Sequence, residues 1–427
     1  MDIFPLLPRL AHVAAALALI LVLAHAGRVI ARRLQQPEVI GEVTVGLLVG
    51  PTLLALLGDD VFGTLLPDPV LDVIALVAQA GLVLFLVGLA HKLRIGPDRP
   101  PRRTMAWVTA GSLVPPLLTG LLLAGWVLLT DDTAARGDAP VAAFVLMLAV
   151  AMSITAVPVM ARILADRGMS ESAAGRLALT SAIVIDAVGW LLLTTAISLG
   201  AGDLTGLLHC LRALLVGAVC GAAVRYGLRT RAAREFCARL PRTVALLLAS
   251  VALAVALTME HLGMTAILGA ALVGLSVPGD GHAAWARPVA LVSRTGRALV
   301  PAFFVVAGIT VLDGADSVVS WPLILIAVVL GCAGKCLGGY AGARLGGRPH
   351  TTACRVAVLM NTRGLTELIV LQAGYSAGLL AAPMVLALVV MALVTTAMTG
   401  PLLTLIDRAE GRTLPGAVPV ETESDRR

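Results

Sequence analysis

Charged side chains are scarce in this sequence, because Asp, Glu, Lys and Arg make up only 14% of its 427 residues while 58% are hydrophobic. A soluble fold carries about 25% charged residues, so the composition excludes a soluble protein. Aromatic residues reach only 4%, which argues against recognition of an organic solute by stacking. The six cysteines have no spacing typical of disulfides or zinc. Without a nucleotide-binding loop or a nucleophile–base pair, neither an enzyme nor a bound cofactor is expected.

Long apolar runs, in contrast, recur from the amino terminus to about residue 406. A helix needs about 20 apolar residues to cross a bilayer. The runs predict an all-α polytopic membrane protein with thirteen transmembrane helices in one domain, 1–407, and a short, disordered cytoplasmic tail, 408–427, without a nucleotide-binding or regulatory domain. The first run lacks a cleavage site and is predicted to be retained. The predicted spans are 9–31, 38–57, 70–91, 104–130, 140–164, 175–200, 204–228, 242–262, 263–278, 293–312, 318–344, 351–375 and 382–406.

The loops between these spans alternate in charge. Of the two alternating sets of loops, one holds the arginines and lysines at 28–33, 92–103, 225–242 and 344–355, whereas the other set is acidic or neutral. By the positive-inside rule the basic loops are cytoplasmic, which places the amino terminus outside and the carboxyl terminus inside a cell membrane. Topology therefore explains the net charge of +6, and the expected partner is the lipid bilayer, not a nucleic acid.

Short strings repeat seven spans apart. VGLLVGP at 45–51 resembles VGLSVP at 273–278, and VLFLVGL at 83–89 resembles AFFVVAGI at 302–309. An odd offset turns the second copy upside down in the membrane. The sequence therefore predicts inverted repeats, an architecture that is common in secondary transporters.

Two spans at matching places in the repeats are interrupted. The fifth contains Ser153, Thr155 and Pro158, and the twelfth contains Asn361, Thr362 and Arg363 in the middle of an apolar run. The proline alone would be explained by a kinked helix. Two matching interruptions instead indicate discontinuous helices that form a binding site near the middle of the membrane.

Ionisable residues inside the spans are few, and Asp186 differs from the others. Its neighbours in the sixth span are apolar and leave its charge without a local partner. A buried carboxylate favours its neutral form and can exchange a proton for a cation. Arg363 and Glu367 stand one helical turn apart, so a structural ion pair is the favoured interpretation there.

The eleventh span has a glycine at every fourth position, which would let a neighbouring helix approach one bare face closely. Lys335 lies beside this face. Two roles are open for its amine, which would either pair with Asp186 when no cation is bound or brace the interrupted helices. The glycines are Gly334, Gly338, Gly342 and Gly346.

Several of these segments together resemble a known family. SITAVPVMARILADRG (153–168), GRLALTSAIVIDAVGWLLL (175–193) and LMNTRGLTELIVLQAG (359–374) are similar to the cation/proton exchanger domain of the sodium/proton antiporter superfamily, closest to its plant CHX-like branch and bacterial relatives. The resemblance extends from about residue 10 to 406. It implies an antiporter fold with crossed broken helices, and a homodimer in which a core moves against a dimerisation part. The implied dimerisation part is 9–91 and 242–312, the core is 104–200 and 318–406, and the linker helix is 204–228.

The same resemblance implies roles for individual residues. Asp186 matches the aspartate that binds the cation or the proton, and a monovalent cation, sodium or potassium, is expected at Asp186 and Thr155. Ser153 and Thr155 belong to the first broken helix, and Lys335 matches the charged residue of the preceding core helix. Asn361, Thr362 and Arg363 belong to the second broken helix. Pro158 and Glu367 are expected to support the broken helices.

One position departs from the pattern of this family. The residue before the aspartate is usually Asn, Asp or Gln, and here it is Ile185. The absence of a second polar group favours electroneutral exchange. Two other functions remain open from the sequence: a sensor or resistance protein that keeps the fold but has lost transport, and efflux of an organic solute by the same fold.

Overall fold

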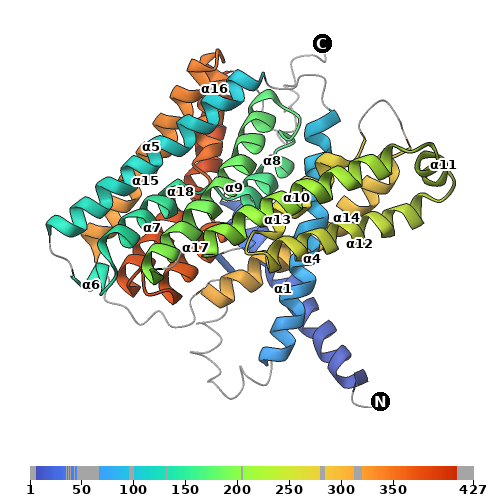
Figure 1. The fold of residues 1–427 in the computed structure, drawn as a ribbon, viewed down its shortest axis with the longest axis horizontal. Coiled ribbons are helices and arrows are strands. Elements are labelled where there is room, and N and C mark those ends of the chain that lie inside the picture. The colour runs from blue at the N-terminus through green and yellow to red at the C-terminus, as the bar shows by residue number, and fades with distance from the viewer. Residues whose placement is uncertain are drawn as a thin grey trace, which may run out of the picture.

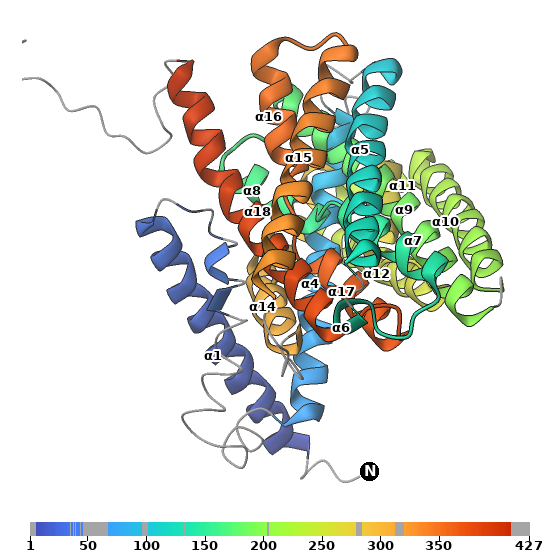
Figure 2. The same ribbon diagram turned by 90° about the vertical axis from the view of Figure 1, so that its left-hand side faces the viewer.

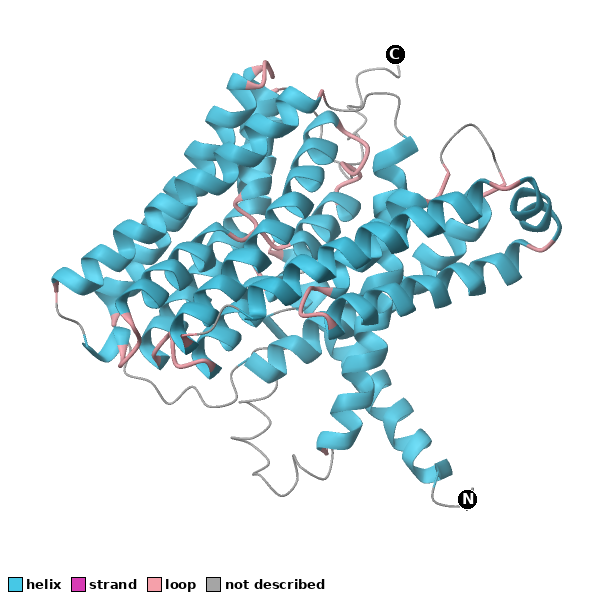
Figure 3. Ribbon diagram, in the orientation of Figure 1, coloured by secondary structure: helices cyan, strands magenta, loops and turns pink. Residues whose placement is uncertain are grey.

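The structure is a computed structural model that describes residues 6–34, 36, 38, 40–42, 44–45, 67–95, 101–130, 133–202, 205–278, 284–311 and 320–410. Every regular element in these ranges is helical (Figure 3), as predicted. The helices are α1 (Leu6–Arg33), α4 (Asp68–Ile95), α5 (Arg102–Leu129), α6 (Thr133–Arg136), α7 (Val141–Ser153), α8 (Val157–Asp166), α9 (Ala173–Ala201), α10 (Thr205–Arg229), α11 (Arg231–Arg239), α12 (Pro241–His261), α13 (Ala266–Ser276), α14 (Ala286–Val311), α15 (Trp321–Leu345), α16 (His350–Met360), α17 (Leu365–Ser376) and α18 (Ala382–Ala409).

Nine of the predicted spans coincide with described segments that are long and apolar enough to cross a membrane. The other four predicted spans are not matched in this way. The predicted span 38–57 and the repeat string at 45–51 lie mostly outside the described residues, α13 has only 11 residues, and the twelfth span consists of two short helices, α16 and α17. The tenth is predicted from residue 293, but α14 already begins at Ala286. The count of thirteen therefore remains a prediction.

The predicted interruptions are real breaks in the helices. α7 ends at Ser153 and α8 begins at Val157, while α16 ends at Met360 and α17 begins at Leu365. Figure 3 shows loop segments in the interior of the bundle, between elements that elsewhere run as continuous helices.

The helices pack in two groups (Figures 1 and 2). The α4–α14 group contains α1, α4, α12, α13 and α14, and the α5–α15 group contains α5, α7, α8, α9, α15, α16, α17 and α18. Within each group the most extensive packing joins two helices that are seven predicted spans apart and run in opposite directions, α4 with α14 and α5 with α15. This arrangement agrees with the predicted inverted repeats.

The glycine face of the eleventh span lies in α15 and packs against α5. A Cβ atom on Gly338 would collide with the backbone carbonyl oxygen of Gly111, and one on Gly334 would lie 3.0 Å from the Cα of Pro116. Near the end of this contact the hydroxyl of Thr104 donates to the carbonyl oxygen of Gly346 at 2.7 Å. The close approach predicted from the glycine spacing is therefore present, and α5 is the neighbour that makes it.

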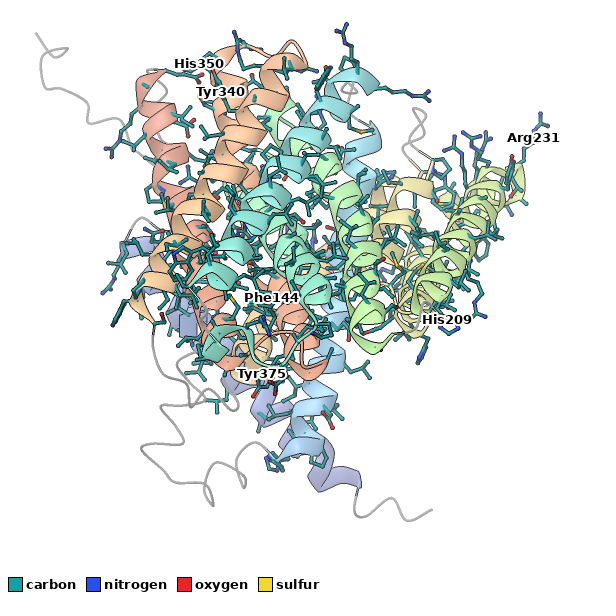
Figure 4. The ribbon with its side chains drawn as sticks, turned by 60° about the vertical axis from the view of Figure 1, so that its left-hand side comes forward. Phe144, His209, Arg231, Tyr340, His350 and Tyr375 are labelled. Atoms are coloured by element: carbon teal, nitrogen blue, oxygen red, sulfur yellow. The ribbon has the colours of Figure 1, made fainter. Side chains whose placement is uncertain are left out.

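One end of the bundle carries most of the basic residues. There Arg355 at the start of α16 forms ion pairs with Asp407 and Glu410 near the end of α18. At the α15–α16 turn the hydroxyl of Tyr340 and Nδ1 of His350 lie 2.9 Å apart (Figure 4). Helix α18 continues to Ala409, and most of the predicted tail, residues 411–427, lies outside the described ranges.

The short helix α11 is not predicted by the sequence patterns. It begins after Thr230, whose hydroxyl accepts a hydrogen bond from the amide of Ala233 at 3.2 Å. Its arginines lie on an exposed surface, with Arg231 at the outer tip in Figure 4. A helix of nine residues is too short to span a bilayer. This agrees with the charge pattern, which places these residues in a basic loop.

Candidate functional site

The first break exposes helix ends inside the bundle. After Ser153 the backbone is extended at Ile154, and α8 restarts at Val157. Pro158 is the second residue of α8, where its missing N–H removes no helical hydrogen bond. Pro158 is therefore compatible with the start of α8, and its support of the break remains a prediction.

The second break lies against the first. The amide of Ala156 donates to the carbonyl oxygen of Thr362 at 3.2 Å, which joins the two extended segments directly. Gly364 has φ 153°, a conformation that L side chains rarely adopt, and a Cβ there would lie 2.7 Å from Cγ2 of Val159 in α8. The glycine is therefore required for the close approach of the two breaks.

A threonine of α18 holds the second break in place. The hydroxyl of Thr396 accepts from the amide of Arg363 at 2.9 Å and donates to its carbonyl oxygen at 2.7 Å. One hydroxyl thus satisfies both backbone groups of a residue that has left the helix. No sequence pattern indicates this role, since the partners are 33 residues apart.

Two cationic side chains converge on the carboxyl end of α7. The guanidinium of Arg363 donates to the carbonyl oxygens of Ala151 at 3.0 Å and Met152 at 2.6 Å, and the amine of Lys335 donates to that of Ser153. The carbonyl end of a helix carries a partial negative charge that cations stabilise. Arg363 and Lys335 therefore cap the broken helix from its unpaired end.

Lys335 braces the break and does not pair with Asp186 in this structure. Its buried amine also donates to the carbonyl oxygen of Ser112 in α5 at 3.1 Å and to the hydroxyl of Thr155 at 2.7 Å. Of the two roles open from the sequence, the geometry matches bracing. The predicted cation contact at Thr155 remains a prediction, since the Thr155 hydroxyl contacts the Lys335 amine here.

The predicted ion pair of the second break is present. Nη1 of Arg363 lies 2.8 Å from Oε1 of Glu367, and both side chains are buried. Glu367 stands in the first turn of α17, where a carboxylate is favoured by the positive end of the helix. Its charge is therefore compensated twice, by Arg363 and by the helix.

Asp186 lies on α9 where this helix passes the first break. A Cβ on Gly189, less than one turn further along, would lie 2.9 Å from Cγ1 of Ile154. The side chain of Asp186 is only 1% exposed. Its Oδ2 accepts a hydrogen bond at 3.2 Å from the hydroxyl of Thr265, which belongs to the other group of helices. The carboxylate thus lies at the boundary between the two groups.

Thr265 is not among the predicted site residues. It precedes α13, and its hydroxyl also accepts from the amide of Leu268 at 3.3 Å, so it is the N-cap of this helix. A threonine before an apolar run is a recognisable helix start. That signal locates the cap, but not its contact with a residue 79 positions away.

Several buried oxygens near the two breaks have no hydrogen-bond partner among the described residues. Unpaired buried oxygens are costly, and they are typical of sites that receive a ligand or a proton. No cluster of three or more His, Cys, Asp or Glu that would hold a resident metal is found in the described part of the chain. The oxygens are Oδ1 of Asp186, Oδ1 of Asn361, Oγ1 of Thr362, Oγ1 of Thr366 and Oε2 of Glu367.

The remaining predicted residues, Ser153 and Asn361, make contacts close to the two breaks. The hydroxyl of Ser153 donates to the carbonyl oxygen of Val150 at 2.9 Å, within its own helix. The amide of Asn361 donates to the carbonyl oxygen of Thr395 at 3.4 Å. The structure thus brings both breaks, Lys335 and Asp186 into one buried region.

Comparison with known proteins agrees with this geometry. The transmembrane domain of sodium/hydrogen exchangers matches residues 17–406. The Na(+)/H(+) antiporter NhaS4 of Synechocystis is 31% identical over 88% of this chain and 92% of its own length. Cation/H(+) antiporter 19 of Arabidopsis thaliana is 30% identical over 87% of this chain and 47% of its own. K(+)/H(+) antiporter 1 of Saccharomyces cerevisiae is 27% identical over 87% and 44%. The chain thus spans about half the length of the plant and yeast relatives.

A solved structure has the same fold. The sodium proton antiporter MjNhaP1 from Methanocaldococcus jannaschii superimposes with a TM-score of 0.61 at 18% identity, over 92% of this chain and 99% of that one. At this identity the likeness concerns the arrangement of helices alone. It agrees with the antiporter fold predicted from the two broken helices.

Proposed function

This chain belongs to the sodium/hydrogen exchanger family, and from that premise we propose that it is a secondary active transporter exchanging a monovalent cation for protons across a membrane. Members of this family are transporters, not enzymes. The names of the relatives above mention sodium, potassium or an unspecified cation. The proposed cargo is therefore sodium or potassium. The comparisons do not favour a sensor or an organic-solute transporter.

The observation that carries the proposal is the uncompensated charge of Asp186. Glu367 is compensated by Arg363, whereas Asp186 accepts a hydrogen bond from the neutral Thr265 hydroxyl and forms no ion pair among the described residues. An ionised carboxylate without a cation is costly in a buried site. A proton or a monovalent cation would remove this cost, and one excludes the other at the same oxygens.

The capping of α7 supports a cycle that moves no net charge. Arg363 and Lys335 already compensate the carbonyl end of the broken helix, so Asp186 supplies the one negative charge that the substrate must neutralise. Ile185, the preceding residue, is buried and apolar. We therefore infer electroneutral exchange of one cation for one proton.

The two helix groups support alternating access by movement of a core. In this proposal 104–200 and 318–406 form the core, 9–91 and 242–312 form the dimerisation part of a homodimer, and 204–228 links them. The hydrogen bond between Asp186 and Thr265 crosses the boundary between these parts, so it must break when the core moves. The basic loops support a plasma-membrane orientation with the amino terminus outside and the carboxyl terminus in the cytoplasm.

A flux assay tests the exchange activity. The purified protein is placed in proteoliposomes with an imposed pH gradient and a clamped membrane potential, and proton movement is followed after addition of sodium, potassium or lithium. Asp186→Asn, which keeps the shape of the side chain but cannot carry the charge, should abolish cation-dependent proton flux. Asp72→Asn, which alters an exposed carboxylate on α4, is the matched control and should leave the flux unchanged. Full activity of Asp186→Asn would disprove the mechanism.

A further inference from the structure

A large cavity lies at the basic end of the bundle, and no residue of the two breaks lines it. Its volume is about 690 Å³, and it lies between the end of α4, the start of α14 and the α8–α9 connection. A second cavity of about 350 Å³ shares Lys92, Glu171, Ser293 and Arg297 with it. In Figure 1 the upper end of α4 and the start of α14 mark the place. Together these cavities are large enough for a small-molecule ligand.

The charges that line this cavity are strongly unbalanced. Four cationic side chains, Lys92, Arg176, Arg294 and Arg297, face one carboxylate, Glu171. Glu171 lies 3.7 Å from Lys92, which compensates it. The side chain of Arg176 is buried, whereas Arg294 and Arg297 are exposed. The cavity therefore has an excess of positive charge.

Helix ends add to this positive potential. The cavity is lined by three of the first five residues of α14, which are Ala286, Val289 and Ala290. It is also lined by Arg176, which lies in the first turn of α9. Amino-terminal turns of helices carry a partial positive charge and bind anions. The two helix starts thus favour the same sign of ligand as the four cationic side chains.

We propose that this cavity binds a phosphate-bearing anion. Paired arginines on neighbouring turns, such as Arg294 and Arg297, match the geometry of a phosphate group. A transported cation is not the favoured occupant, because a positively lined cavity lowers the local concentration of cations. The phosphate belongs to a soluble phosphorylated metabolite or to the headgroup of an anionic lipid, and a binding experiment with both probes separates these sources.

The ligand would join the two groups of helices. Lys92, Arg294 and Arg297 belong to α4 and α14, whereas Arg176 belongs to α9 and Glu171 to the connection that precedes it. A phosphate held from both sides would restrain the movement of one group against the other. The resulting inhibition of exchange rests on the proposed function, but binding itself does not.

Binding is therefore measured directly on the full-length protein. The soluble probe is metal-free ATP, titrated by calorimetry against the protein in nanodiscs of phosphatidylcholine. The cavity variant is Arg294→Gln/Arg297→Gln. The control is Arg231→Gln/Arg239→Gln, which removes two exposed arginines of α11 outside the cavity. Size-exclusion profiles and thermal unfolding establish that all three proteins are folded.

For a soluble ligand we expect saturable binding of ATP that weakens at least tenfold in the cavity variant and changes less than twofold in the control. For a lipid headgroup we expect phosphatidylglycerol added to the nanodiscs to compete with ATP, and native mass spectrometry to show retained phosphatidylglycerol that the cavity variant loses. Equal binding by all three proteins would overturn the proposal. So would the absence of both ATP binding and variant-dependent lipid retention.

Discussion

The hydrogen bond between Thr265 and Asp186 leads to a quantitative prediction. The hydroxyl donates to Oδ2 at 3.2 Å, which stabilises the ionised carboxylate over the protonated one. Thr265→Val keeps the shape of the side chain and removes the donor. A hydrogen bond to a charged group contributes about 1.5–3 kcal/mol, and the distance is long for an O–H···O bond, so the lower value applies.

A loss of about 1.4 kcal/mol corresponds to a tenfold change in an equilibrium constant. In the proposed cycle the cation binds the ionised form of Asp186, and Thr265→Val makes that form less available. We therefore expect the KM for the cation to rise roughly tenfold. The measurement is cation-dependent proton flux in proteoliposomes at a series of cation concentrations and at constant pH.

Two controls separate the hydrogen bond from other effects of the substitution. Thr265→Ser keeps both the donor and the N-cap, so its KM should remain close to that of the unmodified protein. The hydroxyl of Thr230 accepts a hydrogen bond from the amide of Ala233 at 3.2 Å and is the N-cap of α11. Thr230→Val removes this N-cap and should leave KM unchanged. A KM that falls in Thr265→Val would refute the reasoning, because the hydroxyl would then compete with the cation for Asp186.

Further predictions concern the ion pair and the glycine face. Arg363→Gln leaves Glu367 buried without its partner and should lower the unfolding temperature strongly, since breaking a buried pair costs about 3–5 kcal/mol; the double variant with Glu367→Gln should recover part of the loss in a thermal unfolding assay. An additive double variant would exclude coupling between the two side chains. Gly338→Ala forces α15 away from the Gly111 backbone and should destabilise the protein by about 1–3 kcal/mol. Gly125→Ala, with open space around its Cβ, should be neutral or slightly stabilising in the same assay, and equal unfolding temperatures for the two alanine variants would contradict the packing argument.

The class of the fold and the region of the candidate site follow from the amino-acid sequence alone. Apolar length locates nine of the predicted membrane spans among the described residues, because no water is present in hydrocarbon to satisfy a peptide group. Polar residues that interrupt such spans, as at Ser153 and at Asn361, are tolerated only where other protein groups or water meet them, so both breaks are evident from the order of residues. Asp186 is evident for the same reason, as a charge in an apolar helix.

The connections between these parts, in contrast, depend on tertiary packing. Two roles are open for Lys335 from its sequence context, and its position at the end of α7, beside Thr155, follows from the packing of α15 on α5. Thr265 and Thr396 are ordinary threonines in the sequence, and their contacts join residues that are 79 and 33 positions apart. Hydrogen bonds of this kind depend on which helix faces are brought together, a property of the whole fold that local patterns do not encode.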